Sequence, residues 1–301
     1  MRAGRATTAF MDTIRWVISL KKQDYKNRKK IIDTYTKHHV IEKDPDSMDT
    51  FTDSPYLIPF IAEGSKKAVV IVPGGGYCMK EMENEGTKVA EYLRQQGISG
   101  FVLWYRSCPY YQPIPVMDLQ RAVRMVRSLA DSYGYDKDGI GAVGFSAGGA
   151  QVSFFLNLFM GKDITVDDTP KDSVDQCSDQ LNYAGLIYPA LGYSYNKAMQ
   201  YASFPEDQLD TVEKRKDIEK EYEVTEHLTS ASVPQFLCCG SKDDMVSHAA
   251  IDAYTEKIRA ASGNVTFVNV EGAGHGFGAG TPKYNYWLEH FAEWVKNAER
   301  K

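Results

Sequence analysis

The hexapeptide Gly144–Gly149, with the sequence GFSAGG, is the stretch that decides how this chain folds. It follows the apolar run Ile140–Val143, which is typical of a buried strand, and it leads into the helix-compatible stretch Ala150–Phe159. A serine on such a sharp strand-to-helix turn needs glycine on both sides, because larger side chains there would collide. The turn lifts the hydroxyl of Ser146 clear of the sheet. The pattern predicts that Ser146 is a nucleophile; the alternative is a glycine-rich turn in an ordinary α/β protein.

A candidate base and a candidate acid follow the nucleophile along the chain. His275 lies in a glycine-rich loop just after the alternating run Val265–Val270, so its ring can swing toward the serine. The acid follows another apolar run, Gln235–Cys239, after which Asp243 and Asp244 are adjacent. A carboxylate at this point would hold the imidazole in the correct tautomer. Composition does not separate the two aspartates, either of which could instead be a loop or capping residue, and we expect Asp243 to be the acid.

A fourth element of the site is a run of glycines after the strand Ala68–Val72, in the sequence PGGGY. Glycines let the backbone approach a reacting carbonyl and aim N–H donors at the negative charge that develops on it. The expected donors are the amides of Gly75 and Gly76, together with the amide of Ala147 after the nucleophile. A phosphate-binding loop is a poor alternative, because neither glycine-rich nucleotide motif is present.

Further short motifs continue in order through the chain, and they carry a resemblance to a known family. They are Val72–Tyr77 (VPGGGY), Glu85–Gly86, Val89–Ala90, Gly97–Ile98, Phe101–Arg106 (FVLWYR), Asp118–Arg124 (DLQRAVR), Leu186–Pro189 (LIYP) and Gly274–Gly278 (GHGFG). From about Ala68 to the C-terminus, this set resembles the acetylxylan-esterase-like branch of the α/β-hydrolases. The resemblance does not extend to the N-terminus, and it departs in detail between Met160 and Leu181.

The resemblance implies a fold, a site and an activity. The order serine, acid, histidine is that of the α/β-hydrolase fold. Esterases of this fold often carry His-Gly-Gly-Gly where this chain has Pro73 before its glycines, but the donors are backbone groups and remain. The implied reaction is hydrolysis of a carboxylic ester through an acyl-enzyme, with no metal and no cofactor. The branch spans acetyl esterases on plant sugars and general carboxylesterases, so the substrate is less closely specified.

The pattern of the whole chain predicts an α/β class with a mostly parallel, twisted sheet and helices on both faces. Short apolar runs separated by helical periodicity from residue 68 onward are typical of such a sheet. We expect an N-terminal amphipathic and basic arm at 1–50 and a catalytic domain at 51–301. Two polar segments, near 161–182 and 192–233, are expected to form a variable loop and a small helical lid beside the site.

Charge and cysteine content limit the partners. The net charge of −5 argues against nucleic acid as a partner for the body of the protein. The five cysteines have no metal-like spacing, which favours a reducing, cytoplasmic location. No run is long enough to span a membrane, and the apolar stretch near the N-terminus lacks the cleavage site of a secretion signal.

The first 39 residues hold ten Lys/Arg against three Asp/Glu. Phe10, Ile14, Val17 and Ile18 share one face if this stretch is helical. A helix of this kind can lie on a membrane surface, but we expect it to pack on its own domain or on a partner subunit, as in a homo-oligomer.

The expected function is removal of short acyl groups, plausibly acetyl, from sugars or other small esters. Tyr77 and Phe277 lie in the expected site loops and are weak candidates for contact with the substrate. The alternatives are a general short-chain carboxylesterase or amidase-type hydrolase, and a non-catalytic protein on the same scaffold. Because all the triad candidates are present, the non-catalytic alternative is the least favoured.

Overall fold

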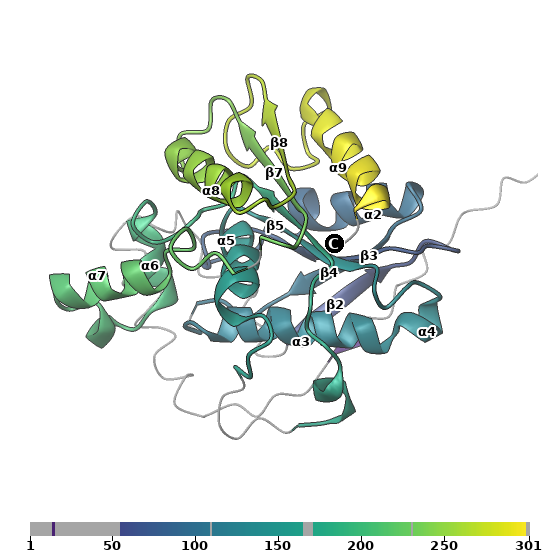
Figure 1. The fold of residues 1–301 in the computed structure, drawn as a ribbon, viewed down its shortest axis with the longest axis horizontal. Helices are drawn as coiled ribbons and strands as arrows, with labels where there is room; N and C mark the ends of the chain where they lie inside the picture. Colours follow the sequence, from purple (N-terminus) through teal and green to yellow (C-terminus); the bar gives the residue numbers. More distant parts are fainter. Residues whose placement is uncertain (1–13, 16–54, 109, 165–170, 230, 299–301) are drawn as a thin grey trace, which may run out of the picture.

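The computed structural model describes residues 14–15, 55–108, 110–164, 171–229 and 231–298 (Figure 1). Within these residues one sheet of eight strands has the order β1-β2-β4-β3-β5-β6-β7-β8. The strands are β1 (Ile14–Arg15), β2 (Tyr56–Phe60), β3 (Ala68–Val72), β4 (Ser99–Trp104), β5 (Ile140–Phe145), β6 (Tyr183–Ile187), β7 (Gln235–Gly240) and β8 (Val265–Val270). From β4 to β8 all neighbours are parallel, whereas β2 runs antiparallel to both β1 and β4.

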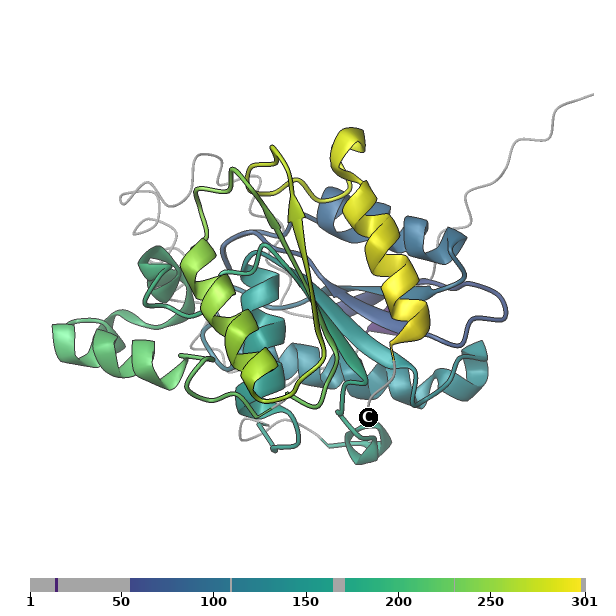
Figure 2. The same ribbon diagram turned by 45° about the horizontal axis from the view of Figure 1, so that its top comes forward.

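Helices cover both faces of the sheet, as the sequence predicts. Those of the described residues are α2 (Lys88–Gln95), α3 (Ile114–Ser128), α4 (Ala130–Tyr133), α5 (Ala147–Phe154), α6 (Lys197–Ser203), α7 (Val212–Glu221), α8 (His248–Ala260) and α9 (Tyr286–Asn297). Short 3-10 or π turns are η2 (Glu83–Thr87), η3 (Phe155–Phe159), η4 (Ser173–Gln176), η5 (Glu206–Gln208) and η6 (Pro282–Tyr284). Figures 1 and 2 show α2 and α9 on one face and α3 and α5 on the other.

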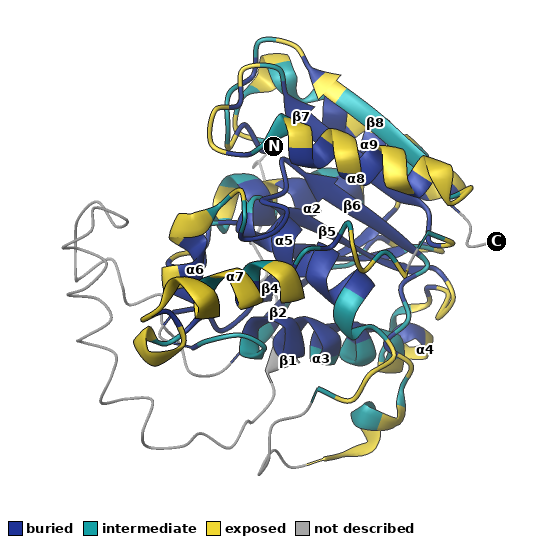
Figure 3. Cartoon of the chain, turned by 60° about the vertical axis from the view of Figure 1, so that its left-hand side comes forward, coloured by how far each residue is buried: buried dark blue, intermediate teal, exposed yellow. Residues whose placement is uncertain are grey.

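The central strands are buried on both sides, because helices pack against each face (Figure 3). Every residue of β3 and of β5 is buried. Gly141 of β5 has no room for a side chain, since a Cβ there would lie 2.2 Å from the ring of Tyr183. The hydroxyl of Tyr183 in turn donates a hydrogen bond to the carbonyl oxygen of Ala68 at 2.9 Å. The nucleophile strand is therefore fixed in the middle of the core.

The two variable segments lie outside the sheet. The segment 192–233 contains α6, η5 and α7, which is the helical excursion that the sequence predicts. Figure 3 shows yellow, exposed faces on α6 and α7. The described part of 161–182 is mainly loop, with η4 as its only regular turn.

The N-terminal arm lies almost entirely outside the described residues. Its described part, Ile14–Arg15, is a short strand paired antiparallel with Tyr56 and Leu57 of β2. The helical turn that the spacing of apolar residues predicts at Ile14 is therefore wrong, since edge pairing with β2 determines the conformation there. The amphipathic face and the basic run of the arm fall on residues that the structure does not describe.

Candidate active site

The turn between β5 and α5 holds Ser146 in a strained backbone conformation, with φ 50° and ψ −116°. A Cβ on Gly144 would lie 2.2 Å from the carbonyl oxygen of Gly148, and a Cβ on Gly148 would lie 2.1 Å from that of Val72. These contacts explain why the sequence has glycine on both sides of Ser146. The Ser146 amide donates to the carbonyl oxygen of Ile187 at 3.0 Å, which anchors the turn to the neighbouring strand β6.

The structure brings the predicted nucleophile, base and acid together in one hydrogen-bonded chain. His275 Nε2 lies 2.8 Å from Ser146 Oγ, and His275 Nδ1 lies 2.8 Å from Asp243 Oδ2. The side chain of Asp243 is fully buried and that of His275 is 12% exposed. Asp244 is exposed. In this geometry His275 can accept the serine proton while Asp243 holds the ring.

Hydrogen bonds keep Asp243 ionised. Burial alone would raise the pKa of this carboxyl, but the hydrogen bond and charge of His275 outweigh burial, and the pKa lies below its usual value. The amides of Met245 and Val246 add to this effect, since both donate to Asp243 Oδ1, at 3.0 and 3.2 Å. One carboxylate oxygen is thus occupied by the backbone and the other by the imidazole. This arrangement fixes the ring orientation of His275.

The glycine loop after β3 lies directly against the nucleophile. A Cβ on Gly74 would be 2.9 Å from Ser146 Cβ, and Gly75 and Gly76 both have positive φ, 125° and 61°. The turn is closed by the amide of Met79, which donates to the carbonyl oxygen of Gly75 at 3.0 Å. Ala147 is the first residue of α5, so its N–H lacks an acceptor within the helix. The glycine loop and the first turn of α5 thus lie beside Ser146, and an oxyanion hole formed by the amides of Gly75, Gly76 and Ala147 stays a prediction.

Two buried residues of this region were not assigned a role by the sequence reasoning. Glu85 of η2 accepts a hydrogen bond from the Gly74 amide at 2.7 Å and another from the Tyr188 hydroxyl at 2.8 Å. The Tyr188 hydroxyl also accepts from the Gly278 amide at 3.1 Å, and the Tyr188 ring meets that of His275 edge-on with centroids 4.9 Å apart. Both residues stand in motifs that carry the family resemblance, which is the only sequence signal that marks them.

The two weak candidates for substrate contact are buried in aromatic packing. Tyr77 is 1% exposed, and its ring meets that of Tyr105 edge-on. Phe277 is 5% exposed and packs edge-on against Tyr188 and Trp287. Their contact with the substrate stays a prediction.

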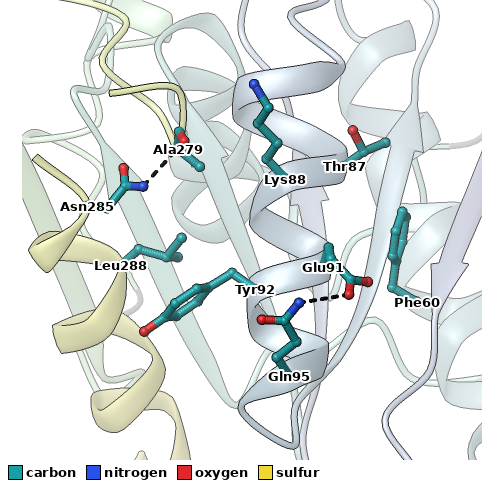
Figure 4. Close-up of a pocket in the computed structure, with 9 residues that line it drawn as sticks. All are labelled: Phe60, Thr87, Lys88, Glu91, Tyr92, Gln95, Ala279, Asn285 and Leu288. Carbon is teal, nitrogen blue, oxygen red and sulfur yellow. Dashed lines mark hydrogen bonds between the residues drawn. The ribbon is translucent and has the colours of Figure 1, made fainter. Parts of the chain in front are cut away.

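A surface groove of about 460 Å³ lies between α2 and α9, and Figure 4 shows the side chains that line it. Its lining residues are Phe60, Thr87, Lys88, Glu91, Tyr92, Gln95, Ala279, Asn285 and Leu288, none of which belongs to the catalytic chain described above. The described residues hold no group of three or more His, Cys, Asp or Glu side chains arranged to bind a metal ion. Among the same residues, no helix is both long and apolar enough to cross a membrane.

Comparison with curated proteins finds esterases. The chain is 25% identical over 246 residues to an acetylxylan esterase of Xylanibacter ruminicola, covering 80% of this chain and 48% of the relative. It is 26% identical over 219 residues to esterase LipC of Mycobacterium tuberculosis, covering 69% of this chain and 52% of the relative. The chain thus spans about half the length of these relatives.

Solved structures agree with the architecture over nearly all of their length. An acetyl ester-xyloside bifunctional hydrolase from Caldicellulosiruptor lactoaceticus superposes with a TM-score of 0.66 at 25% identity, covering 85% of this chain and 94% of that structure. A thermophilic esterase from Thermogutta terrifontis, solved with propionate bound, also gives 0.66, at 23% identity, covering 82% and 91%. The latter likeness shows the fold alone. Both comparisons support the α/β-hydrolase fold that the sequence predicts.

A family model described as BD-FAE matches residues 56–258. The match begins at β2 and ends within α8, so it contains the glycine loop, the nucleophile turn and the acid. It covers more than half of the chain. The chain therefore belongs to the BD-FAE family and has the α/β-hydrolase fold.

Proposed function

We propose that this protein is a serine esterase that removes short acyl groups, acetyl above all, from hydroxyls of sugars or other small alcohols. The observation that carries this proposal is the continuous chain from Ser146 through His275 to Asp243, with 2.8 Å at each step, on a strained turn at the centre of the sheet. Buried structural histidines rarely join a serine on such a turn to an ionised carboxylate. The esterase relatives support the same reaction class.

In the acylation step, Ser146 Oγ attacks the ester carbonyl carbon while His275 Nε2 takes the hydroxyl proton. The negative charge that forms on the carbonyl oxygen would be held by the amides of Gly75, Gly76 and Ala147. As the tetrahedral intermediate collapses, the C–O bond to the alcohol breaks and His275 gives its proton to the leaving oxygen. Asp243 stabilises the transient imidazolium without itself taking the proton.

In the deacylation step, a water molecule attacks the acyl-enzyme carbonyl while His275 accepts a proton from it. The same backbone amides hold the second tetrahedral intermediate. Its collapse releases the carboxylic acid and returns the proton to Ser146 Oγ. Every proton taken is given back, so the cycle needs only water as a co-reactant.

Short acyl groups suit the polar character of the variable segments. Helix α7 has the sequence VEKRKDIEKE and buries only Ile218. Such a helix offers little apolar wall for a long acyl chain, and each extra buried methylene would contribute only about 0.8 kcal/mol even in a good pocket. The proposal of acetylated sugars as substrates draws on two similar proteins, an acetylxylan esterase and an acetyl ester-xyloside hydrolase.

A general short-chain carboxylesterase is the second candidate, and one observation favours it. Met79, next to the glycine loop, is 55% exposed, and Met245, two residues after the acid, is 68% exposed. Both belong to loops that hold parts of the site. Apolar side chains there would suit an apolar alcohol better than a sugar.

The test combines one variant with a substrate series. We expect Ser146→Ala to remain folded and to lose about three or more orders of magnitude in kcat on p-nitrophenyl acetate, because it removes only the nucleophile. In the wild-type protein, kcat/KM should be highest for acetyl, lower for butyryl and lowest for octanoyl p-nitrophenyl esters. Acetate should be released from short acetylated xylo-oligosaccharides.

Two outcomes would contradict the proposal in separate parts. A folded Ser146→Ala protein with near wild-type activity would reject the serine mechanism. A steady rise of kcat/KM with acyl chain length, with no acetate released from any sugar ester, would be compatible with the serine mechanism but would favour the second candidate, a general carboxylesterase.

A further inference from the structure

We propose that Glu85 is a positioning residue. Through its carboxylate and the hydroxyl of Tyr188, it connects the glycine loop after β3 (residues 73–77, here the oxyanion loop) to the loop after β8 that carries His275 (residues 271–278, here the histidine loop). The inference rests on the serine esterase mechanism proposed above. It concerns how the loop after β3 and the loop after β8, which are not neighbours in the sheet, are held in a fixed position relative to each other. The two residues are 103 positions apart in the chain and meet only in the fold.

The carboxylate of Glu85 bridges two loops. Glu85 is 4% exposed and lies in η2, the turn that follows the oxyanion loop. Its Oε2 accepts from the amide of Gly74, the glycine that lies against Ser146, and its Oε1 accepts from the hydroxyl of Tyr188. Each oxygen therefore serves a different loop.

Tyr188 carries the link onward to the histidine loop. It follows β6 in a positive-φ conformation, 35°, and is fully buried. Its hydroxyl accepts from the amide of Gly278, three residues after His275, and its ring contacts that of His275. A separate backbone contact supports the same junction, because the Ala279 amide donates to the carbonyl oxygen of Asn84 at 2.8 Å.

The number of donors requires a carboxylate at position 85. The amides of Gly74 and Gly278 can only donate, so the Tyr188 hydroxyl, having accepted from Gly278, gives its own proton to Glu85. A carboxylate accepts on both oxygens. A glutamine has one acceptor oxygen and one donor NH₂ group, so with its oxygen on Gly74 its NH₂ group would face the Tyr188 hydroxyl, whose own proton would then lose its acceptor.

The charge of Glu85 also acts on the base. The pKa of this carboxyl lies above its usual value, because burial raises it by more than the hydrogen bonds from Tyr188 and Gly74 and the charge of His275 lower it. Glu81 is the other titratable group that acts on the carboxyl, and Glu85 itself acts on the buried Tyr105 hydroxyl. The attraction between Glu85 and His275 works in both directions, so a negative Glu85 stabilises the imidazolium that forms during catalysis.

The kinetic test uses Glu85→Gln, Tyr188→Phe, the double variant and Glu83→Gln. Glu83 lies in the same turn, is 70% exposed at its side chain and pairs with Lys88, so its substitution is the matched control for charge. We expect Glu85→Gln and Tyr188→Phe each to lower kcat by about 10- to 100-fold with KM nearly unchanged. The double variant should be no worse than Glu85→Gln alone, because both substitutions break the same link.

The pH profile separates positioning from a merely structural role. Glu85→Gln removes the negative charge, so the acidic limb of kcat/KM should move to lower pH. Tyr188→Phe and Glu83→Gln should leave that limb where it is in the wild type. A Glu85→Gln protein with the kcat and pH profile of Glu83→Gln would overturn the proposal. A Glu85→Gln protein whose melting temperature falls while the acidic limb of its kcat/KM profile stays at the wild-type pH would overturn it as well. If Glu85→Gln is insoluble, wild-type kcat in Tyr188→Phe overturns it.

A readout independent of turnover distinguishes failure of this inference from failure of the proposed function. Hydrogen exchange should quicken in peptides covering 73–79 and 274–280 in Glu85→Gln, and only in 274–280 in Tyr188→Phe. Unchanged exchange in both peptides of Glu85→Gln would overturn the inference even if the esterase proposal stands. A wild-type protein that hydrolyses no ester would reject the esterase proposal, while the exchange data would still decide the link.

Discussion

At the residue scale, two adjacent aspartates show how far a sequence can locate a site. Asp243 is buried and bonded to His275 and to two backbone amides, whereas Asp244 is exposed. Both are short acidic residues in the same turn after β7. Neighbouring residues in a turn point in different directions, and composition does not reveal which one faces the histidine.

We expect Asp243→Asn to lower kcat on p-nitrophenyl acetate by about 10⁴-fold, because the amide would hold His275 in the wrong tautomer. Asp244→Asn is the matched control and should leave kcat nearly unchanged, since its side chain is solvated. Both are measured at saturating substrate on folded protein. A larger loss in Asp244→Asn would reassign the acid, and two small losses would mean that the acid lies elsewhere.

Other site residues differ in how visible they are in the sequence. Ser146 and His275 are marked by glycine-rich loops that directly follow apolar strands, so local pattern is enough to find them. Glu85 and Tyr188 are marked by no local chemistry. Their role arises from hydrogen bonds between loops that the fold brings together, and a single sequence does not report such contacts.

At the scale of elements, the buried ion pair between β4 and α3 corrects an expectation. From the sequence, Asp118 and Arg121 are expected to form a structural salt bridge rather than to take part in chemistry. Instead Asp118 pairs with Arg106, which follows β4, at 2.7 Å, and both side chains are almost fully buried. Arg121 points outward and pairs with Asp172 and Asp175. The reason is that the inner face of α3 packs on the sheet, so a buried carboxylate there needs a buried cationic partner, which the loop after β4 supplies.

This pair predicts a large effect on stability. Asp118→Asn would leave the guanidinium of Arg106 buried without an anion, which we expect to lower the free energy of unfolding by about 3 kcal/mol or more. Urea unfolding measures the change. The control is Glu91→Gln, which breaks a half-exposed pair with Arg94 on α2 and should alter stability little. Equal changes in the free energy of unfolding for Asp118→Asn and Glu91→Gln would contradict the prediction that the buried pair of Asp118 with Arg106 stabilises the packing of α3.

Element boundaries show which signals decide a fold. The alternation of apolar strands and amphipathic helices from β3 onward is confirmed, including the start of α8 at His248. The sequence reasoning misses β2, the strand Tyr56–Phe60, because its short run is interrupted by Pro59. Among the described residues, β1 pairs with β2 at Tyr56 and Leu57 and not at Pro59, which is compatible with a proline near the sheet edge. Edge strands depend on pairing more than on their own pattern.

At the scale of the whole molecule, one buried lysine makes stability depend on pH. Lys80 is 6% exposed, donates to Ser107 Oγ at 2.8 Å and lies over the rings of Trp104 and Tyr105. Burial lowers its pKa to about 7, against the opposing charges of Asp118, Cys108 and Cys78. The unfolded chain keeps this proton up to about pH 10.4, so between these values the unfolded state binds more protons than the folded one.

The free energy of unfolding should therefore rise with pH from about 7 to 10.4 through this residue, by up to about 1.4 kcal/mol per pH unit. In Lys80→Met this contribution is absent. Urea unfolding between pH 6.5 and 9.5 should show the wild type gaining stability relative to the variant as pH increases. Lys66→Met removes an exposed lysine and should follow the wild-type slope. If the free energy of unfolding changes with pH in the same way in wild type and Lys80→Met, the lowered pKa of Lys80 is contradicted.

The position of β8 at the edge of the sheet bears on how the proposed activity would respond to heating. In the described part of the chain, β8 pairs with β7 alone, and most of its residues are only half-buried. Its final residues lead directly into the loop that holds His275. An edge strand of mostly half-buried residues thus leads to the base, while the nucleophile follows a strand that is buried at every residue. Local unfolding of β8 would displace His275 and stop catalysis while the rest of the domain is still native. The rate of thermal inactivation would then follow the opening of this edge strand rather than global unfolding.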